Sequence, residues 1–224
     1  MSVSDFEALV SVAADAAARW ESKGDPNWAA RTYVQATIAS LRVAVKSSTQ
    51  ASGIAYLEAG ETEKYLQKAV HYYDLLEQEI KAGRLPSSVV GGSYHLTVLA
   101  HVGVLVGRED ICDRVLAFSR LDFVIAQGPA FWNEYCHAFS SMRARRPYQP
   151  PARVGKRLEY WHPYLELIAA LSTEGDATDS IERVSESFRR RNADRRFKDD
   201  QYGVEGSGSE PASWDFRLAS LANR

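Results

Sequence analysis

Several features that would assign this 224-residue sequence to a class of protein are scarce or missing. Two cysteines, Cys112 and Cys136, are too few for a disulfide framework or for a zinc site with four thiolate ligands. No apolar run approaches the roughly 20 residues that a membrane-spanning helix needs. The first residues lack a basic segment followed by an apolar core, so no secretory signal is expected. These absences favour a cytoplasmic protein that makes no contact with a membrane.

Signatures of catalysis and of cofactor binding are missing as well. None of the five histidines lies in a His-Glu-x-x-His arrangement, and residues 203–208 lack the lysine and the preceding strand of a phosphate-binding loop. Residues 199–210 resemble a calcium loop only faintly, because its fifth position is a glycine without a ligand side chain and its sixth position lacks the glycine of the turn. We therefore expect no enzyme activity, no cofactor and no metal.

An excess of one charge is missing too. Lysine and arginine total 27 and aspartate and glutamate total 29, so the net charge is −2 and no field of the whole chain attracts nucleic acid. The composition, 45% hydrophobic and 25% charged residues, is that of an ordinary globular protein.

The apolar residues that are present follow a helical period. Their spacing of three and four predicts a series of antiparallel helices with no strands, which is an all-α fold. The predicted helices span residues 5–22, 27–58 with a break near 46–48, 61–82, 88–106, 109–118, 130–142, 158–171, 178–195 and a short final helix near 214–221. Residues 55–66 are similar to a tetratricopeptide-type turn, although no 34-residue period recurs, so the array is expected to contain tetratricopeptide-like hairpins.

A proline- and arginine-rich segment divides the predicted helices into two groups. Residues 143–157 contain three prolines and six basic residues. The prolines stiffen the chain towards an extended form. We expect a helical-hairpin array over 1–142, a linker over 143–157, and C-terminal helices over 158–224 that pack on the array as one domain.

The C-terminal region concentrates arginines, acids and aromatic residues. Residues 183–198 contain seven basic residues. They bind either a partner that carries phosphate or acidic groups, or the acidic residues of this same segment at helical spacing. A tail-to-body network is predicted to lock the structure, in which an arginine reaches Asp215 and Trp214 packs on Tyr160 or Trp161. Its predicted members are Arg190, Asp194, Arg195, Trp214, Asp215 and Arg217.

The sequence Arg-Asn-x-Asp-x-Arg at 191–196, followed by Trp-Asp-Phe-Arg at 214–217, comes after a wholly helical region. This combination resembles helical immunity proteins of bacterial polymorphic-toxin and type VI secretion systems. The resemblance implies a cytoplasmic antidote without catalysis or cofactor, which binds a cognate toxin or effector domain and blocks its active site or substrate access. Because nuclease toxins are frequent targets, it favours an acidic docking face, and the first residues to test are Glu58, Asp74, Glu77 and the aromatic Tyr73.

Three other functions remain open at this stage. The alternative is a repeat-like helical adaptor that binds a peptide or protein partner in its groove. A nucleic-acid-associated protein would use the basic segments 143–157 and 183–198, but the balanced charge makes nucleic acid an unexpected partner. A helical enzyme would need a site that only the fold assembles. Interface anchors in a binding protein would come from the aromatic residues, most of which we expect in the core: Trp28, Tyr33, Tyr56, Tyr72, Tyr73, Trp132, Tyr135, Tyr160 and Trp161.

Overall fold

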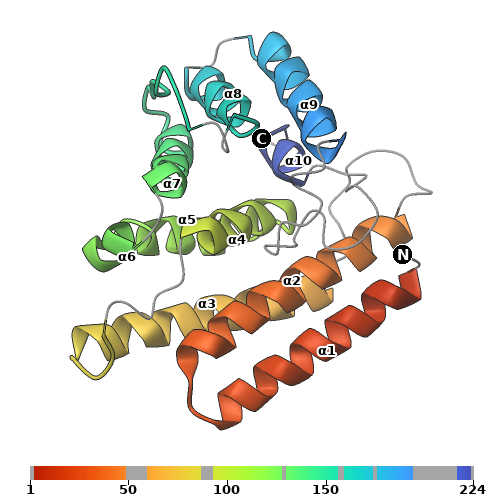
Figure 1. The fold of residues 1–224 in the computed structure, drawn as a ribbon, viewed down its shortest axis with the longest axis vertical. Coiled ribbons are helices and arrows are strands. Elements are labelled where there is room, and N and C mark those ends of the chain that lie inside the picture. The colour runs from red at the N-terminus through yellow and green to blue at the C-terminus, as the bar shows by residue number, and fades with distance from the viewer. Residues whose placement is uncertain are drawn as a thin grey trace. The chain divides into compact units, whose positions relative to one another are not determined.

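The structure is a computed structural model that describes residues 3–48, 60–86, 93–127, 130–155, 159–173, 176–193 and 216–222. Every regular element in these ranges is a helix, so the expected all-α fold is confirmed (Figure 1). The chain forms two compact units, Met1–Pro129 and Ala130–Ala222, which we call the N-terminal unit and the C-terminal unit. None of the helices in the described ranges combines the length and the apolar character needed to cross a membrane.

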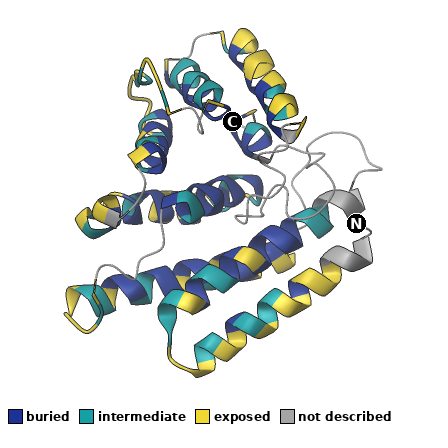
Figure 2. Ribbon diagram, in the orientation of Figure 1, coloured by how far each residue is buried: buried dark blue, intermediate teal, exposed yellow. Residues whose placement is uncertain are grey.

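The N-terminal unit consists of long helices followed by short ones. Its helices are α1 (Val3–Ser22), α2 (Pro26–Ser48), α3 (Gly60–Lys81), α4 (Ser93–Leu105), α5 (Glu109–Phe118) and α6 (Asp122–Gln127). Helix α2 lies between α1 and α3, and α4 packs mainly on α5 while also contacting α2 and α3. Figure 2 shows the result: α2, α3 and α4 are mostly buried along their shared faces, whereas α1 is largely exposed or half-buried.

The turn between α1 and α2 is fixed by its local sequence. Gly24 takes a φ of 68°, a left-handed value that other residues adopt only at a cost, and this ends α1. Asp25 then caps α2, because its Oδ1 atom accepts a hydrogen bond of 3.0 Å from the backbone N–H of Trp28. Pro26 occupies the first helical position, where its missing N–H costs nothing.

Helices α4 and α5 approach each other closely at a glycine. A Cβ atom on Gly103 would lie 3.1 Å from the carbonyl oxygen of Arg108 and 3.3 Å from the Cβ atom of Cys112. The fully buried Leu96 and Leu99 contribute to the hydrophobic core from α4. Glycine at 103 is therefore what lets α5 pack against this helix.

The C-terminal unit contains α7 (Ala130–Arg143), α8 (His162–Ser172), α9 (Thr178–Ala193) and α10 (Phe216–Ala222). Helix α8 packs against both α7 and α9, and α10 contacts α9. The segment 146–155 has no regular structure, and side-chain hydrogen bonds attach it to α7 and α8. The Tyr148 hydroxyl donates to Glu134 at 2.8 Å, and Nε2 of His162 lies 2.8 Å from the carbonyl oxygen of Pro151.

The helix boundaries agree with the expected ones in most places. The helix predicted at 109–118 has those bounds, while the short α6 was not predicted. The long helix predicted to reach residue 58 is described only as far as Ser48, because residues 49–59 lie outside the described ranges. The two units divide between Pro129 and Ala130, before the proline- and arginine-rich segment, so α7 belongs to the C-terminal unit. The tetratricopeptide-like relation stays a prediction, as half of its motif lies within 49–59.

Candidate protein-binding surface

The acidic residues expected to dock a partner lie on α3 beside an arginine of α5. The Arg114 guanidinium donates hydrogen bonds of 2.7 Å to both Asp74 and Glu77. Glu77 also accepts a bond of 2.6 Å from Lys81, one helical turn further along α3. Both carboxylates therefore take part in an ion-pair network between α3 and α5.

The protonation of Glu77 reflects this network. Burial alone would raise the pKa of its carboxyl, but the hydrogen bonds from Lys81 and Arg114 outweigh burial and hold that pKa below its ordinary value. Asp74 and Glu77 are thus matched by cations within the fold, and their role in docking a partner stays a prediction. Glu58 lies outside the described residues, and Tyr73 is buried, so it is not a surface anchor.

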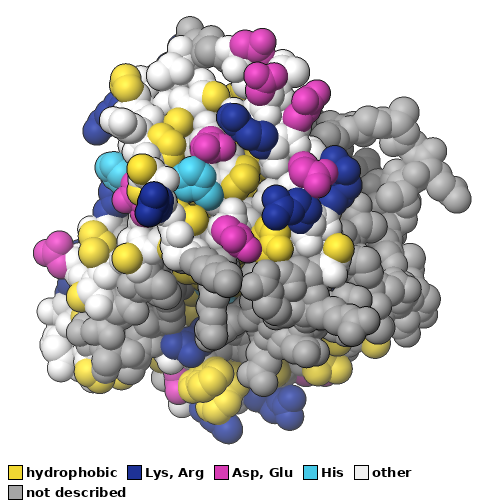
Figure 3. All heavy atoms as spheres, turned by 45° about the horizontal axis from the view of Figure 1, so that its top comes forward, with side chains coloured by type: hydrophobic (Ala, Val, Ile, Leu, Met, Phe, Trp, Pro, Cys, Tyr) yellow, Lys and Arg dark blue, Asp and Glu magenta, His cyan; other side chains and the backbone are white. Residues whose placement is uncertain are grey.

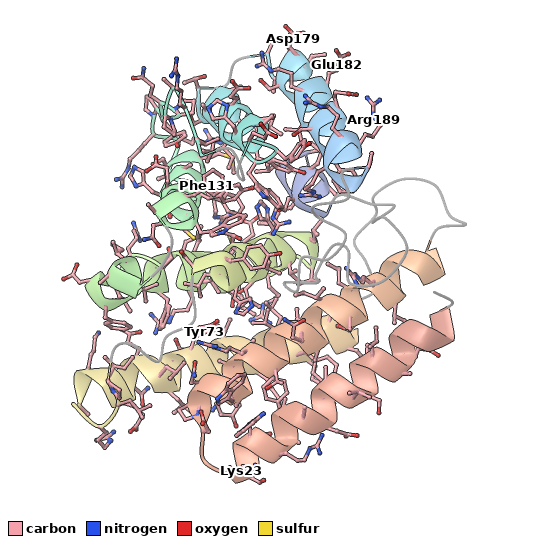
Figure 4. All side chains as sticks on the ribbon, viewed as in Figure 1. Lys23, Tyr73, Phe131, Asp179, Glu182 and Arg189 are labelled. Atoms are coloured by element: carbon pink, nitrogen blue, oxygen red, sulfur yellow. The ribbon has the colours of Figure 1, made fainter. Side chains whose placement is uncertain are left out.

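Tyr73 of α3, labelled in Figure 4, and His95 of α4 each bury a polar atom in the N-terminal unit. The Tyr73 hydroxyl and the Nδ1 atom of His95 are shielded from solvent, and neither has a hydrogen-bond partner within the described part of the chain. Burial and the nearby Arg31 lower the pKa of His95 to about 4, so the imidazole is neutral in the fold at neutral pH. Burial raises the pKa of Tyr73, against the opposing effect of Arg31.

A second polar network joins the three long helices. The Tyr33 hydroxyl of α2 donates to the Glu21 carboxylate of α1 at 2.7 Å, and Lys68 of α3 donates to Glu21 at 3.2 Å and to Tyr33 at 3.0 Å. Tyr72 also bonds to Glu21, and its ring stacks on Tyr33 with centroids 5.7 Å apart. Burial would raise the pKa of Glu21, but these bonds lower it, so the carboxylate fixes α1 to both neighbours in its charged form.

Two tryptophans stack at the α1–α2 turn. The rings of Trp20 and Trp28 lie 5.6 Å apart with an angle of 22° between their planes, and Trp28 is 45% exposed. The Lys23 ammonium lies 4.4 Å from the Trp20 ring centroid, and the Arg31 guanidinium lies 5.3 Å from that of Trp28. Cations at these distances are attracted to the ring faces. The turn, marked by Lys23 in Figure 4, therefore carries an aromatic pair with positive neighbours.

Apolar side chains continue along α1 from this turn. Leu9, Val12, Ala16 and Trp20 follow one another at intervals of three and four residues, so they lie on one side of the helix. Leu9 is 42% and Val12 63% exposed. We call these four residues together with Trp28 the α1 strip. It contains three of the five large hydrophobic side chains that the described residues expose, the others being Ile125 and Ile181.

Buried arginines distinguish the C-terminal unit. The guanidinium of Arg191 on α9 lies 4.4 Å from the Trp161 ring centroid, and that of Arg217 on α10 lies 4.7 Å from the same ring. Arg191 is 3% and Arg217 0% exposed. Trp161 also contacts Trp132 of α7, with centroids 5.1 Å apart. One indole thus joins three helices of this unit.

The predicted tail-to-body network is described only in part. Arg217 is buried in the C-terminal unit, as a locking role requires, and Arg190 lies with its guanidinium 5.8 Å from the Tyr160 ring centroid. Sequence analysis did not include Arg191, although its position on the buried side of α9 with Val184 and Ser187 was a usable signal. The other predicted members, Asp194, Arg195, Trp214 and Asp215, lie outside the described residues.

Two basic residues of α9, Arg183 and Arg189, pair with nearby acids. Arg189 contacts Glu186 at 2.9 Å on the same helix, and Arg183 reaches across to Glu166 of α8 at 3.4 Å. Figure 4 places Asp179, Glu182 and Arg189 along the outer side of α9, and Figure 3 shows acidic and basic side chains intermingled on this unit. This mixture favours internal pairing over a continuous basic patch for a phosphate backbone.

Neither thiols nor carboxylates gather into a metal site where the structure can be described. Cys112 and Cys136 are both buried and are not joined in a disulfide. In the seven described ranges, no group of three or more His, Cys, Asp and Glu side chains is arranged to hold a metal ion. The calcium-like segment 199–210 lies outside these ranges.

Comparison with known proteins adds no relative to this geometry. No protein-family model matches the chain, and no match is found among curated proteins or among solved structures.

Proposed function

We propose that this chain is a protein-binding module that acts by surface contact, and that its partner is a bacterial toxin or effector domain which it neutralises as an immunity protein. The observation that supports binding is the α1 strip. Tryptophan is among the residues that dominate interface energies, and Trp28 is exposed beside a second tryptophan and two cations.

The strip is unusual for the outer side of an edge helix. Terminal helices of helical arrays normally present a polar outer face, because no further layer covers them. Here α1 packs on α2, and Leu9 and Val12 remain exposed. Covering apolar surface contributes roughly 25 cal/mol per Å² removed from water, so a partner seated here gains affinity from side chains that contribute little to folding.

The identity of the partner rests on the resemblance in the C-terminal sequence. The pattern at 191–196 and 214–217 is similar to helical immunity proteins. Of this pattern, residues 191–193 and 216–217 fall within the described residues. The resemblance supports a toxin or effector as the partner, and it is the basis for proposing an immunity protein in particular.

Neutralisation of the protein encoded by the adjacent gene tests this function. That protein is expressed from an inducible promoter in a bacterial host, with this chain or an empty plasmid supplied in trans. We expect growth to stop with the empty plasmid and to recover with the chain, and a purified 1:1 complex with an inactivated form of the toxin.

Two results would contradict the proposal in different ways. Growth arrest that this chain does not relieve, together with the absence of a complex in calorimetry, removes the immunity function. A stable complex with an adjacent product that is not toxic favours the alternative, a helical adaptor.

A further inference from the structure

The prolines of the segment 146–155 limit its backbone conformation. The proline ring fixes φ at about −65°, and a residue that precedes a proline avoids the helical region and takes an extended conformation. Pro147, Pro150 and Pro151 therefore constrain every residue of 146–151 except Tyr148. The described ranges contain no cis peptide bond, so these prolines are trans. The constraints favour a polyproline II helix, which has three residues per turn.

Burial along the segment follows the same repeat of three. Tyr148 and Pro151 are both half-buried, and both attach the segment to the C-terminal unit. The Tyr148 hydroxyl donates to Glu134 of α7 at 2.8 Å, and the Pro151 carbonyl oxygen lies 2.8 Å from Nε2 of His162 in α8. Residues three apart share one side of a polyproline II helix, so this side faces α7 and α8. The other two sides of the segment face away from these helices.

Pro147, Pro150 and Arg153 follow one another at the same interval on a second side, which we call the proline ridge. Pro147 and Arg153 are exposed, and Pro150 is half-buried. Among the residues that the structure describes, none forms an ion pair or a hydrogen bond with the Arg153 guanidinium. The ridge thus presents two proline rings and a cation, held in place from behind by Tyr148 and Pro151.

These features define the chemistry of a partner. Pro147 and Pro150 have the P-x-x-P spacing of segments that dock in aromatic-lined grooves, where the preformed polyproline II helix loses little conformational entropy on binding. The Arg153 guanidinium adds a preference for an acidic residue next to such a groove. A nucleic acid fits less well, because proline rings offer nothing to phosphates and the whole chain has a net charge of −2.

From these observations we infer that the proline ridge is the docking site for a protein domain with an aromatic-lined groove that binds polyproline II helices and with acidic residues that meet Arg153. The inference goes beyond the proposed function, because it concerns a different surface of the chain and does not depend on a toxin as partner.

Two purified domains that bind proline-rich segments, a Src-homology-3 domain with an acidic pocket and a WW domain, are the probes. Each is isotope-labelled and titrated with the full-length chain while its NMR spectrum is recorded. We expect the aromatic groove of at least one domain to respond, with a Kd below about 1 mM. Pro147→Ala should weaken this binding about tenfold, and Arg153→Glu should weaken it about tenfold and reduce its dependence on salt.

Matched controls make the same changes elsewhere in the chain. Pro86→Ala alters another exposed proline without regular structure, and Arg120→Glu reverses the charge of another exposed arginine, both in the N-terminal unit. Neither control should change the affinity. Circular dichroism and thermal melting of each variant establish that any lost affinity does not arise from unfolding.

Three results would overturn the inference. The first is that neither groove responds at about 1 mM of the chain. The second is binding that tolerates both Pro147→Ala and Arg153→Glu, since the contact then lies elsewhere. The third is a single-stranded oligonucleotide that binds the chain more tightly than either domain and is released by Arg153→Glu but not by Pro147→Ala. Neutralisation of the adjacent gene product is measured separately, so each proposal can fail without the other.

Discussion

Two surfaces of the N-terminal unit differ in whether their side chains are paired within the fold or left exposed. On the side formed by α3 and α5, the acids Asp74 and Glu77 are matched by Arg114 and Lys81, so little charge is left for a partner. At the edge formed by α1 and α2, Val12 and Trp28 remain exposed.

The difference teaches that a count of acids along the chain does not locate a binding surface. The resemblance to immunity proteins favoured an acidic docking face, and residues 1–82 do contain more acidic side chains, 11, than basic ones, 8. The charges of Asp74 and Glu77 are compensated within the fold, because each carboxylate has a basic partner at hydrogen-bond distance. Exposed apolar area is the more informative quantity, since it has no use within the folded chain.

The largest change in stability is expected from the titration of His95, whose Nδ1 atom is shielded from solvent. As the pH falls below 6.5, His95 takes up a proton in the unfolded chain. In the folded chain the pKa of His95 is about 4, so the imidazole stays neutral there until the pH is lower. Stability is therefore lost between pH 6.5 and about pH 4, by on the order of 3 kcal/mol in all. Urea unfolding of the native chain and of His95→Gln across this range checks the prediction. Parallel curves of stability against pH would show that His95 does not carry this effect.

The second prediction concerns the close contact between α4 and α5, the helix that carries Arg114. Gly103→Ala places a Cβ atom 3.1 Å from the backbone of Arg108 and of Cys112, so one of the helices has to shift. We expect a loss of about 2 kcal/mol in the free energy of unfolding. Gly60→Ala, where the new atom meets nothing within 4 Å, is the control and should be neutral. Equal stability of the two variants would contradict the close approach of α4 and α5.

Removing the cation of the α3–α5 network should cost less. Arg114→Ala leaves Asp74 and Glu77 without their bond to α5, and because the arginine is 42% exposed, solvent reduces the loss to about 1–2 kcal/mol. Thermal melting at low and high salt measures it, and the difference from the native chain should shrink with salt. Arg84→Ala, which breaks an exposed pair with Glu79, should change stability little. A larger effect at Arg84 than at Arg114 is the opposite of what this structure requires.

The smallest effect is expected at the α1 strip in the absence of a partner. Val12→Ser replaces a side chain that is 63% exposed, so stability should change by no more than about 0.5 kcal/mol. Ala17→Val, on the buried side of the same helix, should cost about 1–3 kcal/mol through overpacking. Denaturant melts of the two variants compare the two sides of α1. A costly Val12→Ser would mean that the strip is part of the core.

The helices followed from the sequence because their signals are local. Apolar spacing, the Asp25 cap and the glycines that end helices each act within a few residues, and the predicted 109–118 helix agrees with α5. The missed α6 has only six residues, fewer than two helical turns, which is too short for an apolar period to be recognised.

The candidate surface did not follow, because its meaning depends on contacts between distant residues. Asp74 and Arg114 lie 40 positions apart, so no spacing rule pairs them. In the same way, Trp28 and Tyr33 belong to one helix, yet only Trp28 is exposed, and the direction that each ring takes depends on α1 and α3. The aromatic residues were rightly expected in the core for the most part, since Tyr33, Tyr72, Tyr135 and others are buried.

The position of α10 late in the chain bears on the order of events during synthesis by the ribosome. Helices α1 to α6 complete the N-terminal unit from residues that are translated first, and domains generally fold as units in that order. The C-terminal unit, in contrast, places Arg217 on the Trp161 ring, so its aromatic centre is finished only after residue 217 has emerged. A nascent chain would thus carry a folded first half well before its second half closes.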